Sequence, residues 1–118
     1  MRKDLGMRKG KMIAQGAHAS LRVILDAGAA DGNRYTIEMT DAMKTWMTGR
    51  FAKICVGVDS EAALDDVVSR AKAAGLPCAL IVDAGMTEFH GVPTKTCCAV
   101  GPAWADEVDA ITGSLTLL

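Results

Sequence analysis

The sequence predicts an α/β fold in which helices cover both faces of one sheet. Three observations favour this fold. The chain has 118 residues, which is the length of one domain, so residues 1–118 are expected to form a single one. Half of the residues are apolar and 23% are charged, which excludes a disordered chain. Short apolar runs of the buried-strand type are separated by helical patterns, as in sheets covered by helices.

Two helices are expected in the first half of the chain. Residues 11–27 carry apolar side chains at helical spacing, with polar side chains along the opposite face. Residues 28–39 are expected to form a loop. Thr40 then begins a short helix that Gly49 ends. The apolar face of the first helix comprises Ile13, Ala17, Leu21, Ile24 and Leu25, and its polar face comprises Lys11, Gln15, His18 and Arg22.

Strands and helices alternate in the second half of the chain. Residues 52–58, 78–82 and 96–100 have the apolar composition of buried strands. A helix capped by Asp59-Ser60 separates the first two strands, and a helix that starts at Gly101-Pro102 follows the third. This order places all the strands in one sheet.

Basic residues gather near the amino-terminal end, although the net charge of the chain is −1. Residues 1–22 contain six basic residues and one acidic residue, whereas residues 23–118 contain seven basic and thirteen acidic residues. This division indicates a local anion site rather than general coating of nucleic acid. The turn Arg8-Lys9-Gly10-Lys11 precedes the first helix, where free backbone N–H groups favour a phosphate. The alternative is a solvated basic turn.

The cysteines and histidines do not have the spacing of a metal site, so no metal or cofactor is expected. No apolar run reaches the roughly 18 residues of a membrane span, and the first residues do not resemble a signal peptide. We therefore expect a cytoplasmic protein with reduced, buried thiols. The four cysteines are Cys55, Cys78, Cys97 and Cys98.

Asp83 is the first candidate for catalysis, because it stands at the carboxyl end of a buried strand, where α/β sheets bind ligands. A carboxylate there could orient a water molecule or act as a base; the alternative is a cap for the following turn. Thr87 and Thr96 flank the next loop, beside Lys95, and could bind an anion or a water. A lone histidine such as His18 is more often a hydrogen-bonded structural group than a base.

Four blocks of the sequence, in a fixed order, carry a resemblance over nearly the whole chain. Residues 2–19 read RKDLGMRKGKMIAQGAHA, residues 83–87 read DAGMT, residues 94–96 read TKT, and residues 109–118 read DAITGSLTLL. Each block is similar to a motif of the type 2 peptidyl-tRNA hydrolases. Together they are much more specific than any block alone.

The resemblance implies a compact α/β fold with a mixed, mostly parallel four-stranded sheet. It implies metal-independent hydrolysis of the ester between a peptide and the 3′-terminal ribose of tRNA, which recycles peptidyl-tRNA released from ribosomes, and it allows a homodimer. The family's proposed catalytic group falls on Lys11, Asp83 and Thr96. The residues expected to bind the substrate or the tRNA acceptor end are Arg2, Arg8, Lys9, Gln15, His18, Arg22, Thr87 and Lys95.

The sequence departs from the family pattern at two places. An apolar strand usually precedes the first motif, and here only Met1–Lys3 could supply it, so the first strand is expected to be short. Glu88 stands where the family commonly has glutamine, and a second carboxylate there is expected to raise the pKa of Asp83. Two alternatives are a non-catalytic member that binds a tRNA end or a protein, and an anion-binding metabolic domain unrelated to tRNA.

Overall fold

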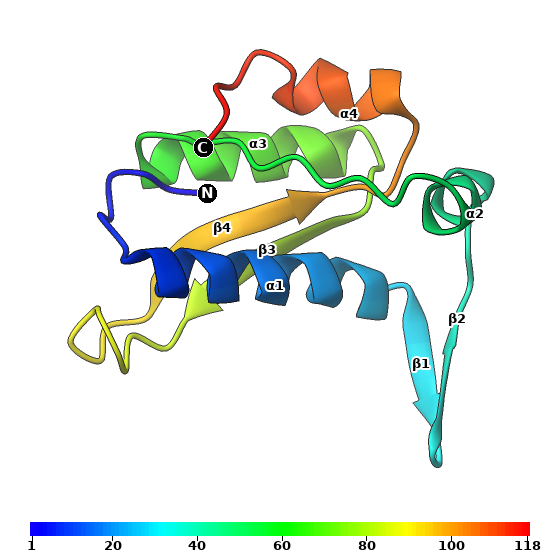
Figure 1. Ribbon diagram of the computed structural model, residues 1–118, viewed down its shortest axis with the longest axis horizontal. Coiled ribbons are helices and arrows are strands. Elements are labelled where there is room, and N and C mark those ends of the chain that lie inside the picture. Colours follow the sequence, from blue (N-terminus) through cyan, green and yellow to red (C-terminus); the bar gives the residue numbers. More distant parts are fainter.

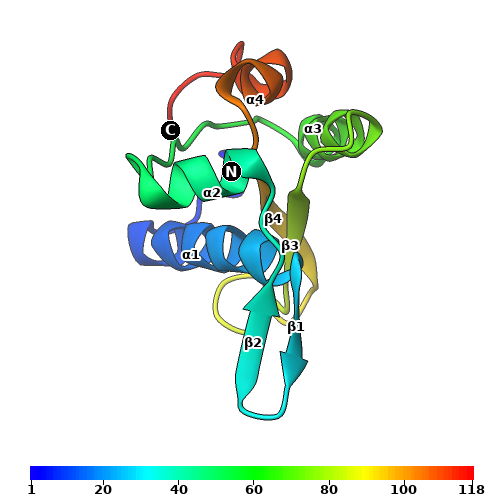
Figure 2. The same ribbon diagram turned by 90° about the vertical axis from the view of Figure 1, so that its right-hand side faces the viewer.

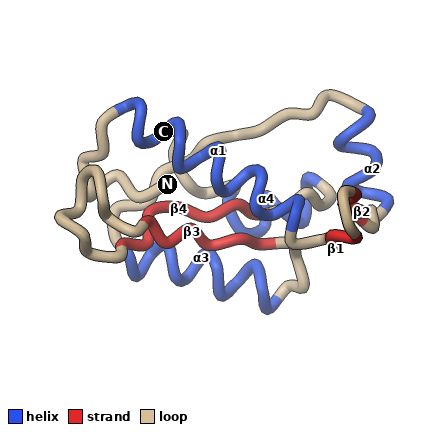
Figure 3. The backbone as a smooth tube through the Cα atoms, turned by 90° about the horizontal axis from the view of Figure 1, so that it is seen from below, coloured by secondary structure: helices blue, strands red, loops and turns tan.

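Four helices and two antiparallel strand pairs make up the computed structural model, which describes residues 1–118 (Figure 1). Helix α1 lies on one face of the β3–β4 pair and helix α3 on the other (Figure 3). None of the helices is both long and apolar enough to cross a membrane. The elements are α1 (Lys9–Leu25), β1 (Gly28–Asp31), β2 (Arg34–Ile37), α2 (Asp41–Thr48), α3 (Glu61–Ala73), β3 (Cys78–Asp83), β4 (Thr94–Val100) and α4 (Ala105–Thr112).

Strands β3 and β4 pair antiparallel in the middle of the molecule, and their register breaks once. Ile81 is opposite Cys97 and the next residue, Val82, is opposite Lys95, so Thr96 is the extra residue of a β-bulge. The bulge lets both Thr96 and Cys97 reach α1, while Lys95 reaches α3 on the other face. This local irregularity therefore decides which side chains of β4 face which helix.

The structure does not confirm the expected four-stranded, mostly parallel sheet. Strands β3 and β4 form a two-stranded antiparallel sheet of their own. Residues 52–58, expected as a strand, make only two isolated bridges: Val56 with Leu117, antiparallel, and Val58 with Arg2, parallel. The chain thus has the α/β composition that the sequence predicts but a different sheet.

Residues 1–3 connect β4 with residue 58. They lie between β4 and residue 58: the backbone N–H of Arg2 donates to the carbonyl of Thr96 at 2.9 Å, and that of Val58 donates to the carbonyl of Met1 at 2.9 Å. They make a single isolated bridge, between Arg2 and Val58. The segment connects the two regions without forming a full strand between them.

The main apolar core lies between the sheet, α3 and α4. Helix α3 begins as expected, since Oγ of Ser60 accepts a hydrogen bond from the backbone N–H of Ala63 at 3.1 Å. Its apolar stripe packs inward, also as expected, and α4 covers it. The buried residues of this cluster are Val58, Leu64, Val67, Ala71 and Ile111.

Helix α1 turns toward the sheet only part of the face that was expected to be polar: Gln15 is buried and Lys11 half-buried, whereas His18 and Arg22 are exposed. Ile13 and Leu21, expected in the core, are 73% and 60% exposed, whereas Gln15, Ala19 and Val23 are buried. Burial of the Gln15 amide costs little, because both of its polar atoms find hydrogen-bond partners on the sheet. The helix itself was predicted correctly, but its orientation was not.

Residues 28–39, expected as a loop, contain a β-hairpin. Strands β1 and β2 pair with Asp31 opposite Arg34, which leaves Gly32 and Asn33 as a two-residue turn. Gly32 has a positive φ of 57°, a conformation that glycine adopts without a steric penalty. Figure 2 shows the hairpin projecting from the end of α1, away from the rest of the molecule.

The thiols differ in burial more than expected. Cys97 is buried under α1, and burial raises the pKa of its thiol. Cys55 is exposed, because residues 52–55 lie at the surface rather than inside a sheet. All four cysteines are free, as expected.

Candidate active site

Lys11 of α1 and Asp83 at the end of β3 form an ion pair where the helix begins and the strand ends. Nζ of Lys11 lies 2.6 Å from Oδ2 of Asp83, and the two side chains are only 12% and 15% exposed. Nζ also donates to Oγ1 of Thr87 at 3.0 Å. The first turn of α1 and the loop after β3 thus hold one cation and one carboxylate in a place with little water.

Asp83 accepts three hydrogen bonds, which fix both of its oxygens. Oδ2 accepts from Lys11 and from Nε2 of Gln15, at 2.6 and 2.8 Å, and Oδ1 accepts from the backbone N–H of Gly85 at 2.8 Å. The hydrogen bond from Lys11 is the largest cause that lowers the pKa of Asp83 below its ordinary value, and the bonds from Gly85 and Gln15 add to it against the effect of burial. Asp83 is therefore a carboxylate at neutral pH. The Gly85 bond is the turn cap weighed in the sequence analysis, and it leaves Oδ2 of Asp83 bound to Lys11 and Gln15.

Gln15 connects Asp83 with Thr96. While its Nε2 donates to Asp83, its Oε1 accepts a hydrogen bond from Oγ1 of Thr96. Thr96 is fully buried, so its hydroxyl reaches Asp83 only through the amide of Gln15. By donating to Oε1, Thr96 orients the amide so that Nε2 points at the carboxylate.

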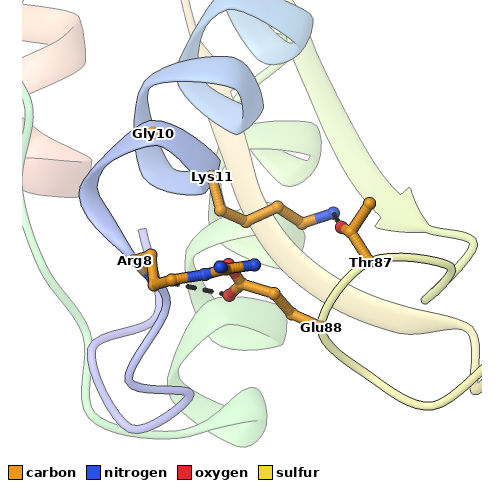
Figure 4. Close-up of a pocket in the computed structure, with 5 residues that line it drawn as sticks. All are labelled: Arg8, Gly10, Lys11, Thr87 and Glu88. Atoms are coloured by element: carbon orange, nitrogen blue, oxygen red, sulfur yellow. Dashed lines mark hydrogen bonds and ion pairs between the residues drawn. The ribbon is translucent and has the colours of Figure 1, made fainter.

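A second ion pair lies beside the first, in a small polar pocket of about 360 Å³ (Figure 4). Nε of Arg8 lies 2.7 Å from Oε1 of Glu88, and the side chain of Arg8 is 79% exposed. The expectation that Glu88 raises the pKa of Asp83 was wrong, because Glu88 is held by Arg8 and the pKa of Asp83 is lowered. The pocket has no apolar residue; it is lined by Arg8, Gly10, Lys11, Thr87 and Glu88.

Three more of the expected binding residues lie on the exposed side of α1. Lys9 stands in its first turn. His18 and Arg22 lie farther along the helix and line a groove that also reaches Asp83. Nε of Arg22 forms an ion pair of 2.7 Å with Asp26, one turn away.

Arg2 and Lys95 are not brought to the candidate site. Nη1 of Arg2 lies 2.8 Å from Glu61, and Nζ of Lys95 lies 2.8 Å from Asp65, so both side chains form ion pairs with α3. Lys95 precedes Thr96 in β4, and the two side chains reach helices on opposite faces of the sheet. Their charges neutralise the acidic start of α3.

Two contacts of the site were not expected from the sequence. The ring of Phe89 lies 5.6 Å from Nζ of Lys11, within the range of a cation–π interaction. Sγ of Cys97 lies 3.3 Å from the backbone carbonyl of Gln15 and can donate to it. No sequence pattern marks either contact, since one depends on how the β3–β4 loop lies beside α1 and the other on how α1 packs on β4.

The histidine, cysteine and acidic side chains do not form a metal-binding group. No three of them gather closely enough to hold a metal ion. The hydrogen-bonded cluster around Asp83 contains one lysine, one amide side chain, the backbone N–H of Gly85 and two hydroxyl groups, those of Thr87 and Thr96.

Comparison with known proteins identifies the family. Residues 1–118, the whole chain, match the sequence model of the family described as Peptidyl-tRNA hydrolase PTH2. The chain belongs to this family. Membership in PTH2 confirms the resemblance found in the sequence and excludes a metabolic domain unrelated to tRNA.

Archaeal members of the PTH2 family resemble the chain along its full length. The peptidyl-tRNA hydrolase of Methanocaldococcus jannaschii is 41% identical over 118 residues, which cover 100% of this chain and 95% of the relative. The peptidyl-tRNA hydrolase of Aeropyrum pernix is 40% identical over 121 residues, which cover 99% of this chain and 90% of the relative. That of Halobacterium salinarum is 42% identical over 117 residues, covering 98% and 93%.

For this PTH2 chain, the structure gathers the three residues of the expected catalytic group. Lys11 and Asp83 are in direct contact, and Thr96 joins them through Gln15. They come from positions far apart in the sequence, so only the packing of α1 on the sheet places them together.

Proposed function

We propose that this peptidyl-tRNA hydrolase breaks the ester bond of its substrate at the Lys11–Asp83 pair. The observation that carries the proposal is the pair itself: an ion pair of 2.6 Å, mostly shielded from water, with free hydrogen-bonding capacity on both partners. Release of an N-acetyl amino acid from N-acetyl-aminoacyl-tRNA, by the wild type and by Asp83→Asn, tests it.

Asp83 holds the attacking water in this proposal. Oδ1 accepts one bond from Gly85 and has a second lone pair left for a water molecule. Because its pKa is lowered, the carboxylate orients the water rather than storing its proton. The water oxygen bonds to the ester carbon, the bond to the ribose oxygen breaks, and the water proton ends on that oxygen.

Lys11 stabilises the negative charge that develops on the carbonyl oxygen. Two of its three N–H groups donate to Asp83 and Thr87, which leaves the third free to donate to the substrate. Shielding from water strengthens such a bond in the transition state. Thr96 is a positioning residue: it fixes Gln15, and Gln15 fixes Asp83.

Lys9 and Arg8 hold the phosphates of the tRNA acceptor end, Arg8 by exchanging its Glu88 partner for a phosphate. They stand at the start of α1, where backbone N–H groups and the helix dipole add to their charge. Phosphate contacts do not read the base sequence, which suits an enzyme that accepts many tRNAs. His18 and Arg22 lie farther along the same helix and line the groove that reaches Asp83.

Three further features of the function are expected from the sequence and from the family resemblance. We propose that hydrolysis needs no metal, that the protein acts in the cytoplasm, and that two copies form a homodimer. The strongly exposed Ile54 and Leu117 are apolar side chains that a second copy could cover. Activity in EDTA, cell fractionation and light scattering at several protein concentrations test these three points.

A further inference from the structure

A groove of about 760 Å³ starts at the catalytic pair and runs along β3 under the edge of α1. It is lined by β3 from Cys78 to Asp83 and by α1 residues from Gln15 to Leu25, and 8 of its 14 residues are apolar. Gln15 and Asp83 belong both to the groove and to the hydrogen-bonded cluster described above. A molecule bound in the groove therefore has one end next to the Lys11–Asp83 pair, where the ester is cut in the proposed mechanism.

The wall of the groove formed by β3 is a free strand edge. Strand β3 pairs with β4 alone, and β4 lies between β3 and the N-terminal segment (Figure 1). On its other edge, the N–H and C=O groups of β3 have no ladder partner. Such an unpaired strand edge can form hydrogen bonds with another extended chain. Val82, near the ester end, is 53% exposed.

The two sides of the Lys11–Asp83 pair differ in chemistry. On the side of the α1 N-terminus, the small pocket with Arg8 and Glu88 contains no apolar residue and fits ribose and phosphate. On the other side, the groove offers apolar side chains such as Leu21 and a row of backbone groups. The substrate has the same division, with a polyanion on one side of the ester and a peptide on the other.

We propose, on the basis of the hydrolase function proposed above, that the groove binds the peptide part of peptidyl-tRNA as an extended strand added to the free edge of β3. Backbone pairing recognises any peptide sequence, as an enzyme for abandoned nascent chains requires. The stretch of α1 from Gln15 to Leu25 is about 15 Å long at about 1.5 Å per residue. An extended peptide rises about 3.3 Å per residue, so the groove accommodates about four to five residues.

A series of substrates tests the length of the site. N-acetyl-oligoalanyl-tRNAs with one to seven alanines are compared with the wild-type protein by kcat/KM. We expect kcat/KM to rise roughly tenfold from one residue to about five, as two or three main-chain hydrogen bonds form, and then to stay constant. N-methylation of the second and third alanines, which removes N–H donors, should abolish the gain.

A variant of the groove and a matched control locate the effect. Leu21→Glu changes an exposed side chain in the groove, and Ile13→Glu changes an exposed side chain of the same helix that does not line it. Leu21→Glu should lower kcat/KM for five alanines to the value for one, while leaving the one-residue substrate unaffected. Ile13→Glu should leave the whole series unchanged.

The outcomes separate the two proposals. If the wild type does not cut the one-residue substrate, the proposed function fails. If it cuts all lengths at one rate, the peptide groove is refuted while the function stands. If Leu21→Glu lowers the rate equally at every length, the groove binds tRNA instead, which also refutes the proposal.

Discussion

Nζ of Lys11 lies 2.6 Å from Oδ2 of Asp83, and 72 positions of sequence separate the two residues. The first turn of α1 supplies the cation, and the last position of β3 supplies the carboxylate. Each keeps unused hydrogen-bonding capacity: one N–H group on Lys11 and one lone pair on Oδ1 of Asp83. In the proposed mechanism, an ester bound beside the pair meets a water held by Asp83 and the positive charge of Lys11.

Replacing Glu88 should strengthen substrate binding. In Glu88→Gln, Arg8 loses its carboxylate partner and becomes available to a phosphate. We expect KM for N-acetyl-aminoacyl-tRNA to fall several-fold at low salt, with a salt dependence steeper by roughly one phosphate contact and kcat unchanged. The double variant Arg8→Ala/Glu88→Gln is the control and should lose this gain. An unchanged KM in Glu88→Gln would show that Arg8 does not contact the tRNA.

Arg2 and Lys9 should behave differently although both are basic residues near the N-terminus. Lys9→Ala should raise KM and reduce the salt dependence, because Lys9 is exposed at the start of α1. Arg2→Ala should instead lower the free energy of unfolding by about 1–2 kcal/mol, since Arg2 pairs with Glu61 and donates to the carbonyl of Lys95. Urea unfolding and a salt series of KM distinguish the two effects. A reduced salt dependence in Arg2→Ala would place Arg2 on the tRNA.

The Lys11–Asp83 pair should stabilise the fold at neutral pH and lose this effect in acid. The pKa of Asp83 in the folded protein lies below its ordinary value of 3.8, chiefly because Lys11 donates to the carboxylate. A group with a depressed pKa contributes its full stabilisation above the ordinary value and loses it as the pH falls through the folded-state value. Urea unfolding of wild type and Asp83→Asn should thus differ by a constant amount from pH 5 to pH 8, and by less below about pH 4. A difference that grows toward acid pH would contradict the assignment.

The link from Thr96 to Asp83 should be visible in both stability and rate. Thr96→Val keeps the shape of the side chain but leaves Oε1 of Gln15 buried without a donor. We expect a loss of about 1–3 kcal/mol in the free energy of unfolding, together with a lower kcat and a nearly constant KM. Thr96→Ser, which restores the hydroxyl, should recover most of kcat. Full activity in Thr96→Val would remove Thr96 from the positioning chain.

Local patterns predicted most of the secondary structure but not the sheet. Helices α2 and α3 and strands β3 and β4 follow from caps and apolar runs that act within a few residues. The hairpin was missed, although Gly32-Asn33 is a recognised two-residue turn, because its exposed strands have no apolar alternation. Residues 52–58 have the composition of a strand, but they make only two isolated bridges and no ladder. Pairing depends on distant segments, which no local pattern describes.

The candidate site, like the sheet, could be predicted only in part from local sequence patterns. The spacing of Lys11 and Gln15 correctly placed them on one face of a helix, yet that face was expected to point away from the core. Only the hydrogen bonds to Asp83 and Thr96 make burial of Gln15 favourable, and they come from the sheet. The bulge that aims Thr96 at α1 has no signature in the sequence. The family motifs indicated Lys11, Asp83 and Thr96 as the expected catalytic group, and the structure shows the hydrogen bonds that connect these residues.

The most direct measurement is release of labelled N-acetyl amino acid from N-acetyl-aminoacyl-tRNA in EDTA, by wild type and Asp83→Asn. Replacing an aspartate oxygen by an amide keeps the shape of the side chain but removes the charge that pairs with Lys11 and that, in the proposed mechanism, holds the water. We expect steady turnover by the wild type and a loss of about a hundredfold or more in kcat for the variant. If folded Asp83→Asn keeps more than about a tenth of the wild-type rate, Asp83 is not the centre of the site. If the folded wild type shows no turnover, the chain is a non-catalytic member of its family.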